Sequence, residues 1–458
     1  MTVGVGDSSK AEASRYGLQQ RGWCAFCRMM VRIFYRRREA VGIEKIPAEG
    51  PVLLCANHPN ALVDPIIIQA LCPRIIHPLA RSGLFDHALA RPFLKILQAV
   101  PIYRRQDAGA DTNRNIESFA RCYELLACGE VLLIFPEGQS HSDSRLRTIR
   151  TGAARLALGS ITASGVAPTV LPVGLTFGDK GRFRSSVFLA VGEPVELASI
   201  PSESSDDAVR RITRLIESGL GDVTLNADSI EDIYLSRRLE RFFALRRGRH
   251  RRGTLEQRFR ALKKLIESQR ILRAREPGEV DALSRRLRQF ERLCDHFRVR
   301  DYQLTVNYSP AIVTRFVLRT LLGLLVGVPI AIWGAINSAI PLVLIGWFAS
   351  RLAKGSQEYD TARMALALAM FLVTWGIQAA AVFWFFGGIA ASLYLVSLPP
   401  ATAAAVIMYR EKDRIVENIK GFFLFLRKTS LRDQLLARRE ELEKELARMA
   451  RLVKRQSD

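Results

Sequence analysis

Two long apolar stretches in the C-terminal half most limit what this chain can fold into. Residues 320–350 contain no charged side chain over 31 positions, and residues 364–409 contain none over 46. A helix needs only about 20 apolar residues to cross the hydrocarbon core of a bilayer. The pattern therefore excludes a wholly soluble protein and predicts a helical membrane region over residues 306–410.

Helix-breaking residues inside both stretches predict that each folds back as a helical hairpin. The first stretch contains Pro329, Asn337 and Pro341, and the second contains Gly387 and Pro399. Such residues are tolerated in membrane helices where the backbone is interrupted. Basic residues flank both stretches and also occupy the linker between them, and basic flanks favour the cytoplasmic side. Two hairpins would place all three basic segments on that side. The first stretch is short for a double crossing, so a re-entrant segment remains an alternative.

The other segments differ from this region in composition. Residues 1–41 read as a tail with an interfacial amphipathic helix over 15–38, residues 42–226 as an α/β domain, residues 227–305 as a basic helical region, and residues 411–458 as a charged helical tail. Alternating β-like runs and amphipathic helices are typical of the α/β class. The predicted fold is therefore a mixed sheet flanked by helices, followed by an Arg-rich helical region and a helical membrane region.

Several elements are expected within these segments. Strands are predicted over residues 52–56, 99–104, 131–135, 169–177 and 186–191. In the basic region, breakers at Gly248, Gly253 and Pro277 predict about three helices. Leucines recur at helical spacing in the tail, which would either pair with another helix or stay solvated.

The charge of the chain indicates anionic partners. Lys and Arg number 67 against 45 Asp and Glu, which gives a net charge of +22. Basic residues flank the apolar stretches and no aromatic-basic nucleic-acid reader is present, so anionic lipid head groups are the expected partners rather than nucleic acid. Because residues 1–20 are polar, no secretory signal peptide is expected. The pair Cys24 and Cys27 has metal-ligand spacing, but it lacks a second pair, so no metal site is predicted.

One polar segment has the composition of a catalytic base. Residues 56–65, Ala-Asn-His-Pro-Asn-Ala-Leu-Val-Asp-Pro, directly follow the first predicted strand. A His acts as a general base near neutral pH when a carboxylate fixes its tautomer and stabilises the imidazolium. His58 and Asp64 would stand about 120° apart on a regular helix, but a turn over residues 58–60 before a helix start would fold the ring back. The alternative is a His that only hydrogen-bonds the nearby backbone.

A second polar segment also follows an apolar strand. Residues 134–143 read Ile-Phe-Pro-Glu-Gly-Gln-Ser-His-Ser-Asp. Pro-Glu-Gly makes a tight turn in which Gly138 is free to adopt a positive φ and backbone N–H groups can face an anion. Glu137 is expected to point into the same mouth as His58 and to accept a hydrogen bond from a substrate hydroxyl. The alternative is an ordinary turn with a solvated Glu.

Together these segments resemble the glycerolipid acyltransferase family, which acylates glycerol phosphates and lysophosphatidate. The resemblance covers about residues 42–200, and four separated motifs occur in the family's order. The first family motif is a His, four residues and an Asp. His58 and Asp64 match its ends and are implied to be catalytic, but five residues separate them here, which leaves their relative geometry open.

The second and fourth motifs also match. The second ends in an acceptor-binding Arg, and its place is taken by Val-Pro-Ile-Tyr-Arg-Arg. Arg104 is the better match, and Arg105 could share the task because a guanidinium fork suits a phosphate. The fourth motif is a strand whose Pro helps to form the acyl or acceptor pocket, and Pro172 fits it. A Pro within a strand otherwise suggests an edge or a bulge.

The third motif indicates a branch of the family. It matches at residues 135–138, but many relatives continue with Thr-Arg-Ser where this chain has Gln-Ser-His. The continuation through Ser140 and His141 is more similar to the branch that includes the fungal glycerol-3-phosphate and dihydroxyacetone-phosphate acyltransferases. Members of that branch follow with a Lys and a Gly, and here Arg150 and Gly152 stand in.

By this resemblance the chain is expected to be a membrane-bound O-acyltransferase of phospholipid synthesis. It would move an acyl chain from an acyl-coenzyme A or acyl carrier protein thioester to glycerol-3-phosphate or dihydroxyacetone phosphate, with no bound cofactor. His58, held by Asp64, would take the acceptor's proton directly, because the motifs contain neither a Gly-x-Ser-x-Gly elbow nor a Cys beside a His. The residues expected to bind substrate are Arg104, Arg105, Glu137, Gly138, Ser140, Arg150 and Pro172.

Three alternatives remain at this point. A lysophosphatidate acyltransferase of the same fold would differ only in its acceptor. A catalytically silent lipid platform is favoured by the five-residue spacing between His58 and Asp64. Nucleic-acid binding is suggested by the charge alone. The oligomeric state is not predicted.

Overall fold

The computed structural model describes residues 17–86, 91–104, 112–180, 182, 184–197, 205–246, 253–297, 299, 301–304, 310–352, 356–427 and 429–454. The chain divides into two compact units. The first comprises Met1–Arg237 and Arg252–Ile266, and the second comprises Arg238–Arg251 and Glu267–Asp458. Helices α8 (Ile230–Arg246) and α9 (Leu255–Arg275) contribute residues to both units.

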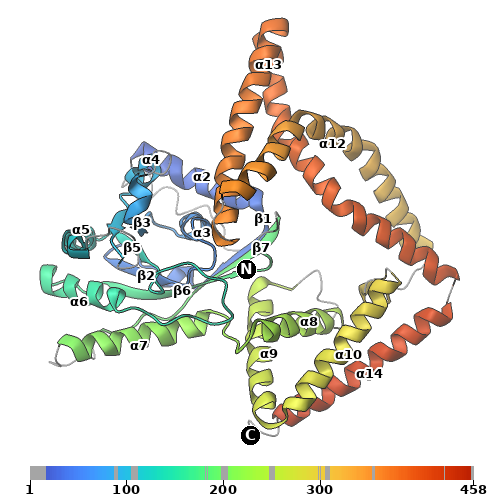
Figure 1. Cartoon of the computed structure of the whole chain (residues 1–458), viewed down its shortest axis with the longest axis horizontal. Helices are drawn as coiled ribbons and strands as arrows, with labels where there is room; N and C mark the ends of the chain where they lie inside the picture. The colour runs from blue at the N-terminus through green and yellow to red at the C-terminus, as the bar shows by residue number, and fades with distance from the viewer. Residues whose placement is uncertain are drawn as a thin grey trace. The chain divides into compact units, whose positions relative to one another are not determined.

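The first unit is built on a seven-stranded sheet (Figure 1). Its strands are β1 (Tyr35–Val41), β2 (Val52–Ala56), β3 (Ile76–Arg81), β4 (Val100–Ile102), β5 (Val131–Ile134), β6 (Thr169–Phe177) and β7 (Ser185–Val191). Their order in the sheet is β1-β7-β6-β2-β5-β3-β4. Only the β6–β7 pair is antiparallel among these neighbours. The predicted mixed sheet is therefore confirmed.

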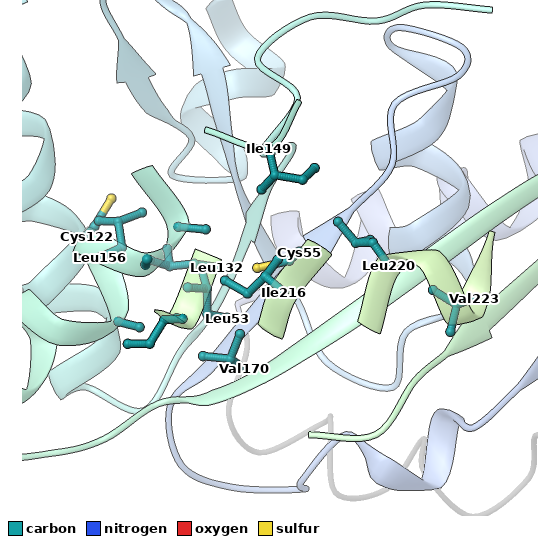
Figure 2. Packing of buried hydrophobic residues seen from close by; sticks show 14 of the residues in the cluster. Leu53, Cys55, Cys122, Leu132, Ile149, Leu156, Val170, Ile216, Leu220 and Val223 are labelled. Atoms are coloured by element: carbon teal, nitrogen blue, oxygen red, sulfur yellow. The ribbon is translucent and has the colours of Figure 1, made fainter. Parts of the chain in front are cut away.

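Helices cover both faces of the sheet. On one face, α5 (Asn115–Ala127), α6 (Gly152–Ser164) and α7 (Ser205–Val223) form a core with the strands that includes Leu53, Cys55, Cys122, Leu132, Leu156 and Ile216 (Figure 2). Alternate strand residues point to opposite faces, and Val52 and Leu54 are fully buried as well. On the face of the sheet opposite α5, α6 and α7, Figure 1 shows α2 (Leu18–Phe34) and α4 (Arg91–Ile96). Burial on both faces explains why β2 is apolar throughout.

Five strands bring the polar segments to one edge of the sheet. Strands β6, β2, β5, β3 and β4 are neighbours and all run in the same direction. Cys55 of β2 stands beside Ile134 of β5 and Pro172 of β6. The segments that follow these strands therefore leave the sheet side by side. In open α/β sheets, ligands bind outside the carboxyl ends of the strands.

The structure corrects the N-terminal boundary of the α/β domain. The sequence placed an interfacial helix over residues 15–38, but α2 ends at Phe34 and residues 35–41 pair with β7 as strand β1. The sheet therefore begins before residue 42. Charged residues are common on edge strands because they discourage further pairing, and the three arginines here concealed the strand. Strand β3 was also not predicted, since His77 and Pro78 interrupt its apolar run.

The basic region forms the expected helices. Helices α8, α9 and α10 (Pro277–His296) confirm the prediction of about three helices in the basic region. Helix α14 (Thr429–Lys454) pairs with α10. Of the two alternatives for the charged tail, pairing with another helix is therefore confirmed. The buried faces of these two helices carry Val280, Leu283, Leu287, Phe290, Leu435, Leu442 and Leu446. Ion pairs from Arg286 to Glu445 and from Arg448 to Glu279 join their exposed sides.

The first apolar stretch does not form the predicted hairpin. Helix α12 (Pro310–Leu352) continues through Pro329 and Pro341 without a break. Membrane helices tolerate Pro because neighbouring helices and local adjustments satisfy the freed backbone groups. The second stretch does turn back: within α13 (Ser356–Arg427), Gly387 has φ 80° and ψ 177°, and Figure 1 shows the chain reversing there. The structure therefore has one long helix and one hairpin.

Both apolar stretches are long and apolar enough to cross a membrane. The candidate spans are Thr320–Pro341 and Met370–Tyr409, and only 11% and 0% of their most apolar windows are buried. Large apolar side chains such as Trp384, Phe386 and Ile389 are exposed. Such wide apolar exposure marks a surface that contacts a membrane or a protein partner rather than a buried core helix.

Close packing and hydrogen bonds join α12 to α13. A Cβ on Gly334 would stand 2.1 Å from the carbonyl oxygen of Ala401, so only glycine permits this approach. The hydroxyls of Ser338 and Thr402 lie 2.5 Å apart. Tyr394 donates its hydroxyl hydrogen to Oδ1 of Asn337 at 2.6 Å. Small residues and interhelical hydrogen bonds of this kind hold membrane helices together.

Candidate active site

His58 and Asp64 meet at the carboxyl end of β2. His58 lies two residues beyond the strand, and Asp64 lies in the first turn of α3 (Val63–Leu71). Nδ1 of His58 lies 2.9 Å from Oδ2 of Asp64, and the same oxygen accepts a hydrogen bond from the N–H of Asn60 at 2.7 Å. The ring is folded back over a turn before the helix, as the sequence predicted.

A tight turn accommodates the additional residue between them. Ala61 has a φ of 38°, in the left-handed region that residues other than glycine rarely adopt. The N–H of Val63 donates to the carbonyl of Asn60 at 3.0 Å, and that of Asp64 to the carbonyl of Ala61 at 3.3 Å. The five-residue spacing therefore does not prevent contact between the imidazole and the carboxylate.

The surroundings of the pair favour a base at Nε2. Burial raises the pKa of Asp64, while its hydrogen bond and charge interaction with His58, the Asn60 hydrogen bond and the charge of Lys180 all lower it. When Asp64 is ionised it holds a proton on Nδ1 and leaves the Nε2 lone pair for a substrate. The ring stacks on Phe135 at 3.8 Å between centroids, and the His58 side chain remains 18% exposed. The arrangement leaves the ring held at Nδ1 and partly open to solvent.

Glu137 holds the backbone of His58. Its Oε1 accepts the N–H of His58 at 3.0 Å, and its Oε2 accepts the N–H of Arg147 at 3.0 Å and contacts Nε2 of His141. The N–H of His141 donates in turn to the carbonyl of His58 at 3.0 Å. The sequence predicted that Glu137 faces a substrate hydroxyl, but its side chain is fully buried. The tight turn at Pro136 directs the carboxylate inward, beneath His58.

Two arginines converge on the turn that follows Glu137. Gly138 has a φ of 75°, as the turn requires. The guanidinium of Arg104, two residues beyond β4, donates to the Gly138 carbonyl at 2.8 Å. A Cβ on Gly138 would stand 2.8 Å from Nε of Arg150, whose side chain is exposed. Ser140 lies on the same loop and is half-buried, whereas Arg105 lies outside the described residues.

Pro172 lies inside the sheet rather than at an edge. Strand β6 stands between β2 and β7. Pro172 stands opposite Gly192, just after β7 ends, and its carbonyl accepts the N–H of Gly192. The β6–β7 ladder begins at the next pair, Val173 and Val191, so the N–H that proline lacks removes no bond from that ladder. Its ring contacts the positions that Cβ atoms on Gly192 and Gly219 would occupy. Pro172 thus packs beneath α7, and its role in an acyl or acceptor pocket stays a prediction.

The sequence reasoning missed Lys180 and Asn57. The Lys180 ammonium donates to the Pro59 carbonyl at 3.1 Å and to Oγ of Ser142 at 3.0 Å. The Asn57 side chain bonds both the N–H and the carbonyl of Leu175 on β6. Lys180 follows β6, so only the order of strands in the sheet reveals that it stands beside the turn after β2.

No cluster of three or more metal-ligating side chains occurs within the residues that the structure describes. Cys24 and Cys27 are both buried in α2. Burial, followed by the charge of Cys24, raises the pKa of Cys27 to about 12. The two cysteines therefore pack as apolar residues of an amphipathic helix.

Comparisons with known proteins agree with the resemblance. Residues 37–176 match the family model described as Acyltransferase. Glycerol-3-phosphate O-acyltransferase 1 of Saccharomyces cerevisiae is 22% identical over 46% of this chain and 40% of its own length. The second yeast enzyme of that name is 32% identical over 27% of this chain and 18% of its own length. The 1-acyl-sn-glycerol-3-phosphate acyltransferase of Bacillus subtilis is 24% identical over 45% of this chain and 98% of its own length.

Among solved structures, the 1-acyl-sn-glycerophosphate acyltransferase PlsC from Thermotoga maritima matches with a TM-score of 0.34 and 18% identity, over 44% of this chain and 79% of that one. The chain spans less than half the length of either yeast relative. The matched family segment contains most of β1, all of β2 to β5, nearly all of β6, and both polar segments. The match to the Acyltransferase family model therefore covers the part of the chain that carries the candidate site.

Proposed function

We propose that the first unit transfers an acyl group from a thioester to the hydroxyl of glycerol-3-phosphate or dihydroxyacetone phosphate. The observation that carries this proposal is the 2.9 Å contact between Nδ1 of His58 and Oδ2 of Asp64, with the ring partly exposed at the carboxyl edge of the sheet. A base in this position removes the hydroxyl proton as the substrate oxygen attacks. The donor is acyl-coenzyme A or acyl carrier protein.

The reaction balances without a covalent enzyme intermediate. A bond forms between the acceptor oxygen and the acyl carbon, and the carbon–sulfur bond of the thioester breaks. The proton taken by Nε2 of His58 passes to the departing thiolate. Cys55, the thiol nearest to His58 in sequence, is fully buried, and burial raises the pKa of its thiol. A buried thiol of this kind is unreactive, which supports direct transfer.

The turn at Gly138 supports binding of the acceptor phosphate. Arg104 and Arg150 reach this turn from two different loops. A guanidinium presents a planar fork of donors that matches phosphate oxygens. In this proposal the arginines hold the phosphate, Gly138 and Ser140 line the glycerol portion, and Glu137 and Asp64 position His58.

The names of relatives support two candidate acceptors. The two yeast relatives are named for glycerol-3-phosphate. The Bacillus subtilis relative is named for 1-acyl-sn-glycerol-3-phosphate and aligns over nearly its whole length. Lysophosphatidate acylation is therefore the second candidate function, and both candidates use the same base and the same thioester chemistry.

The second unit is proposed to anchor the enzyme in a membrane, with the catalytic domain on the cytoplasmic face. The exposed apolar side chains of the candidate spans support an integral position. Helix α2 adds exposed Leu18, Met29 and Ile33 beside several arginines. Apolar and basic residues on one helix favour the interface of an anionic membrane.

Thioester consumption by the full chain in detergent tests the proposed function. Acyl-coenzyme A is supplied with glycerol-3-phosphate, dihydroxyacetone phosphate or lysophosphatidate, each offered separately. Turnover with a small phosphate is the expected result, and turnover with lysophosphatidate alone identifies the second candidate. If no acceptor supports turnover with either acyl-coenzyme A or acyl carrier protein as donor, the enzyme proposal is wrong and a lipid platform takes its place.

A further inference from the structure

Lys180 bridges the two loops that hold the candidate base. It lies three residues beyond the end of β6, next to β2 in the sheet. Its ammonium donates to the Pro59 carbonyl, in the turn that carries His58, and to the hydroxyl of Ser142, in the loop that carries Glu137. One side chain from the segment after a third strand thus connects these two loops.

The position of Lys180 also matters electrostatically. Asp64 is fully buried, and burial raises the pKa of its carboxyl, whereas the positive charge of Lys180 acts in the opposite direction. The same charge lowers the pKa of Asp143, although less than the hydrogen bond from Arg147 does. A charge at the rim of a buried site is screened less than one on an open surface. Lys180 therefore favours the ionised form of the carboxylate that orients His58.

Other charged groups face this region from both loops. On the loop after β2 they are His58 and Asp64, and on the loop after β5 they are Glu137, His141, Asp143 and Arg147. Arg147 pairs with Asp143 at 2.6 Å, and Glu137 is held by His141 and two backbone N–H groups. These carboxylates already have close donors. His58 and Asn60 form hydrogen bonds with Asp64. Besides these two partners, the charge of Lys180 also lowers the pKa of the Asp64 carboxyl.

We propose that Lys180 is a positioning residue for the acyl transfer: it ties the turn that carries His58 to the loop at Ser142 and places a positive charge beside the His58–Asp64 pair. The inference rests on the proposed function, because it assigns Lys180 a part in the same reaction. Lys180 lies outside the four sequence motifs, three residues after the strand that carries Pro172.

The sign of the expected effect follows from the charge. Removal of a cation makes it easier to add a proton to the His58–Asp64 pair, so the base form is reached only at higher pH. The acid limb of the pH profile of kcat/KM therefore moves to higher pH when Lys180 is neutralised.

The test compares Lys180→Met, Lys180→Arg and Lys45→Met in the full chain in detergent. Lys45 is a matched control because its ammonium also reaches a backbone carbonyl, that of Val191, and pairs with Glu193. Lys180→Met is expected to move the acid limb of kcat/KM upward while activity on the alkaline side is largely kept. Lys180→Arg, which retains the charge, is expected to restore the original limb, and Lys45→Met to leave it in place.

Each other outcome overturns the inference. If Lys180→Met leaves the acid limb unchanged, or if Lys45→Met moves it equally, Lys180 has no specific effect on the pair. If Lys180→Met raises the KM for the acceptor without moving the limb, the lysine binds substrate phosphate instead. Failure of the proposed function is distinguished by the unmodified chain, which would then show no turnover with any acceptor and either donor. Far-ultraviolet circular dichroism of each variant checks that the fold is kept.

Discussion

Glu137 accepts a hydrogen bond from the backbone N–H of His58 at 3.0 Å, so the buried carboxylate after β5 fixes the position of the candidate base after β2. The N–H of His141 donates back to the carbonyl of His58. Both backbone polar groups of His58 are thus bound by one neighbouring loop. Preorganisation of this kind lowers the cost of reaching the reactive geometry, and it explains why the two polar segments act as one site.

Glu137→Gln is expected to reduce both stability and activity. The amide retains one acceptor oxygen but cannot serve the N–H groups of His58 and Arg147 and the ring of His141 together. A buried donor left without its acceptor costs about 1–3 kcal/mol. Thermal unfolding in detergent and thioester turnover measure the two effects.

Glu193→Gln is the matched control for this prediction. The Glu193 side chain is 83% exposed and pairs with Lys45 at 2.9 Å. Exposed ion pairs of this kind contribute about 0–1 kcal/mol, so little change is expected. Equal losses in the two variants would show that burial of Glu137 has no special role.

Gly138→Ala is expected to weaken acceptor binding as well as the fold. A φ of 75° costs a residue with a Cβ about 1–2 kcal/mol, and the new Cβ would displace the side chain of Arg150. Gly165→Ala has a similar backbone cost, with a φ of 69°, but its Cβ would meet nothing within 4 Å. Both variants should lose similar stability, and only Gly138→Ala should raise the KM for a phosphorylated acceptor. A raised KM in both would contradict the role of Arg150.

Arg104→Ala is expected to raise the KM for the acceptor by about tenfold or more, because a charge-assisted hydrogen bond contributes about 1.5–3 kcal/mol. The KM for acyl-coenzyme A should change little. Arg121→Ala removes a comparable charge from an exposed pair with Glu124 on α5 and should leave both constants in place. An unchanged acceptor KM in Arg104→Ala would exclude this residue from phosphate binding.

Helix α12 and the part of α13 after Gly387 pack against each other, and each is expected to cross the membrane once, so that α14 returns to the face that holds its partner α10. Its charge-free part of 31 residues would extend about 46 Å at the rise of an α-helix, which exceeds a hydrocarbon core of about 30 Å. A cysteine placed at Ser356, where α13 begins, should therefore react with an impermeant thiol reagent on the opposite face from Cys128, which is exposed in the first unit. The labelling of each cysteine is measured in sealed vesicles of both orientations. Labelling of both cysteines from the same face would support the hairpin that the sequence predicted.

The sequence predicted the elements whose patterns are local. Strands β2 and β6 match their expected ranges because short apolar runs are bounded by turn residues. Strand β1 was missed because its pairing with β7 is decided by residues about 150 positions away. The unbroken course of α12 through Pro329 and Pro341 could not be predicted, because a proline can either kink a membrane helix or end it, and its sequence neighbours do not distinguish the two.

The candidate site shows the same division. The meeting of His58 with Asp64 was predictable, because a turn and a helix start lie between them. The burial of Glu137 and the presence of Lys180 were not, because both depend on the neighbours of β2 in the sheet. Motif spacing in the sequence identifies candidate catalytic residues. The order of strands in the sheet decides which of these side chains lie close together.

Thioester turnover by His58→Ala beside the unmodified chain tests the central claim most directly. General-base catalysis contributes about 10²–10⁴-fold, so the variant should lose at least that factor with the preferred acceptor. Asp64→Asn should also lose activity, because an amide no longer holds the ring with Nε2 unprotonated. Near-normal turnover by a folded His58→Ala protein would contradict the account, because acyl transfer would then proceed without this base.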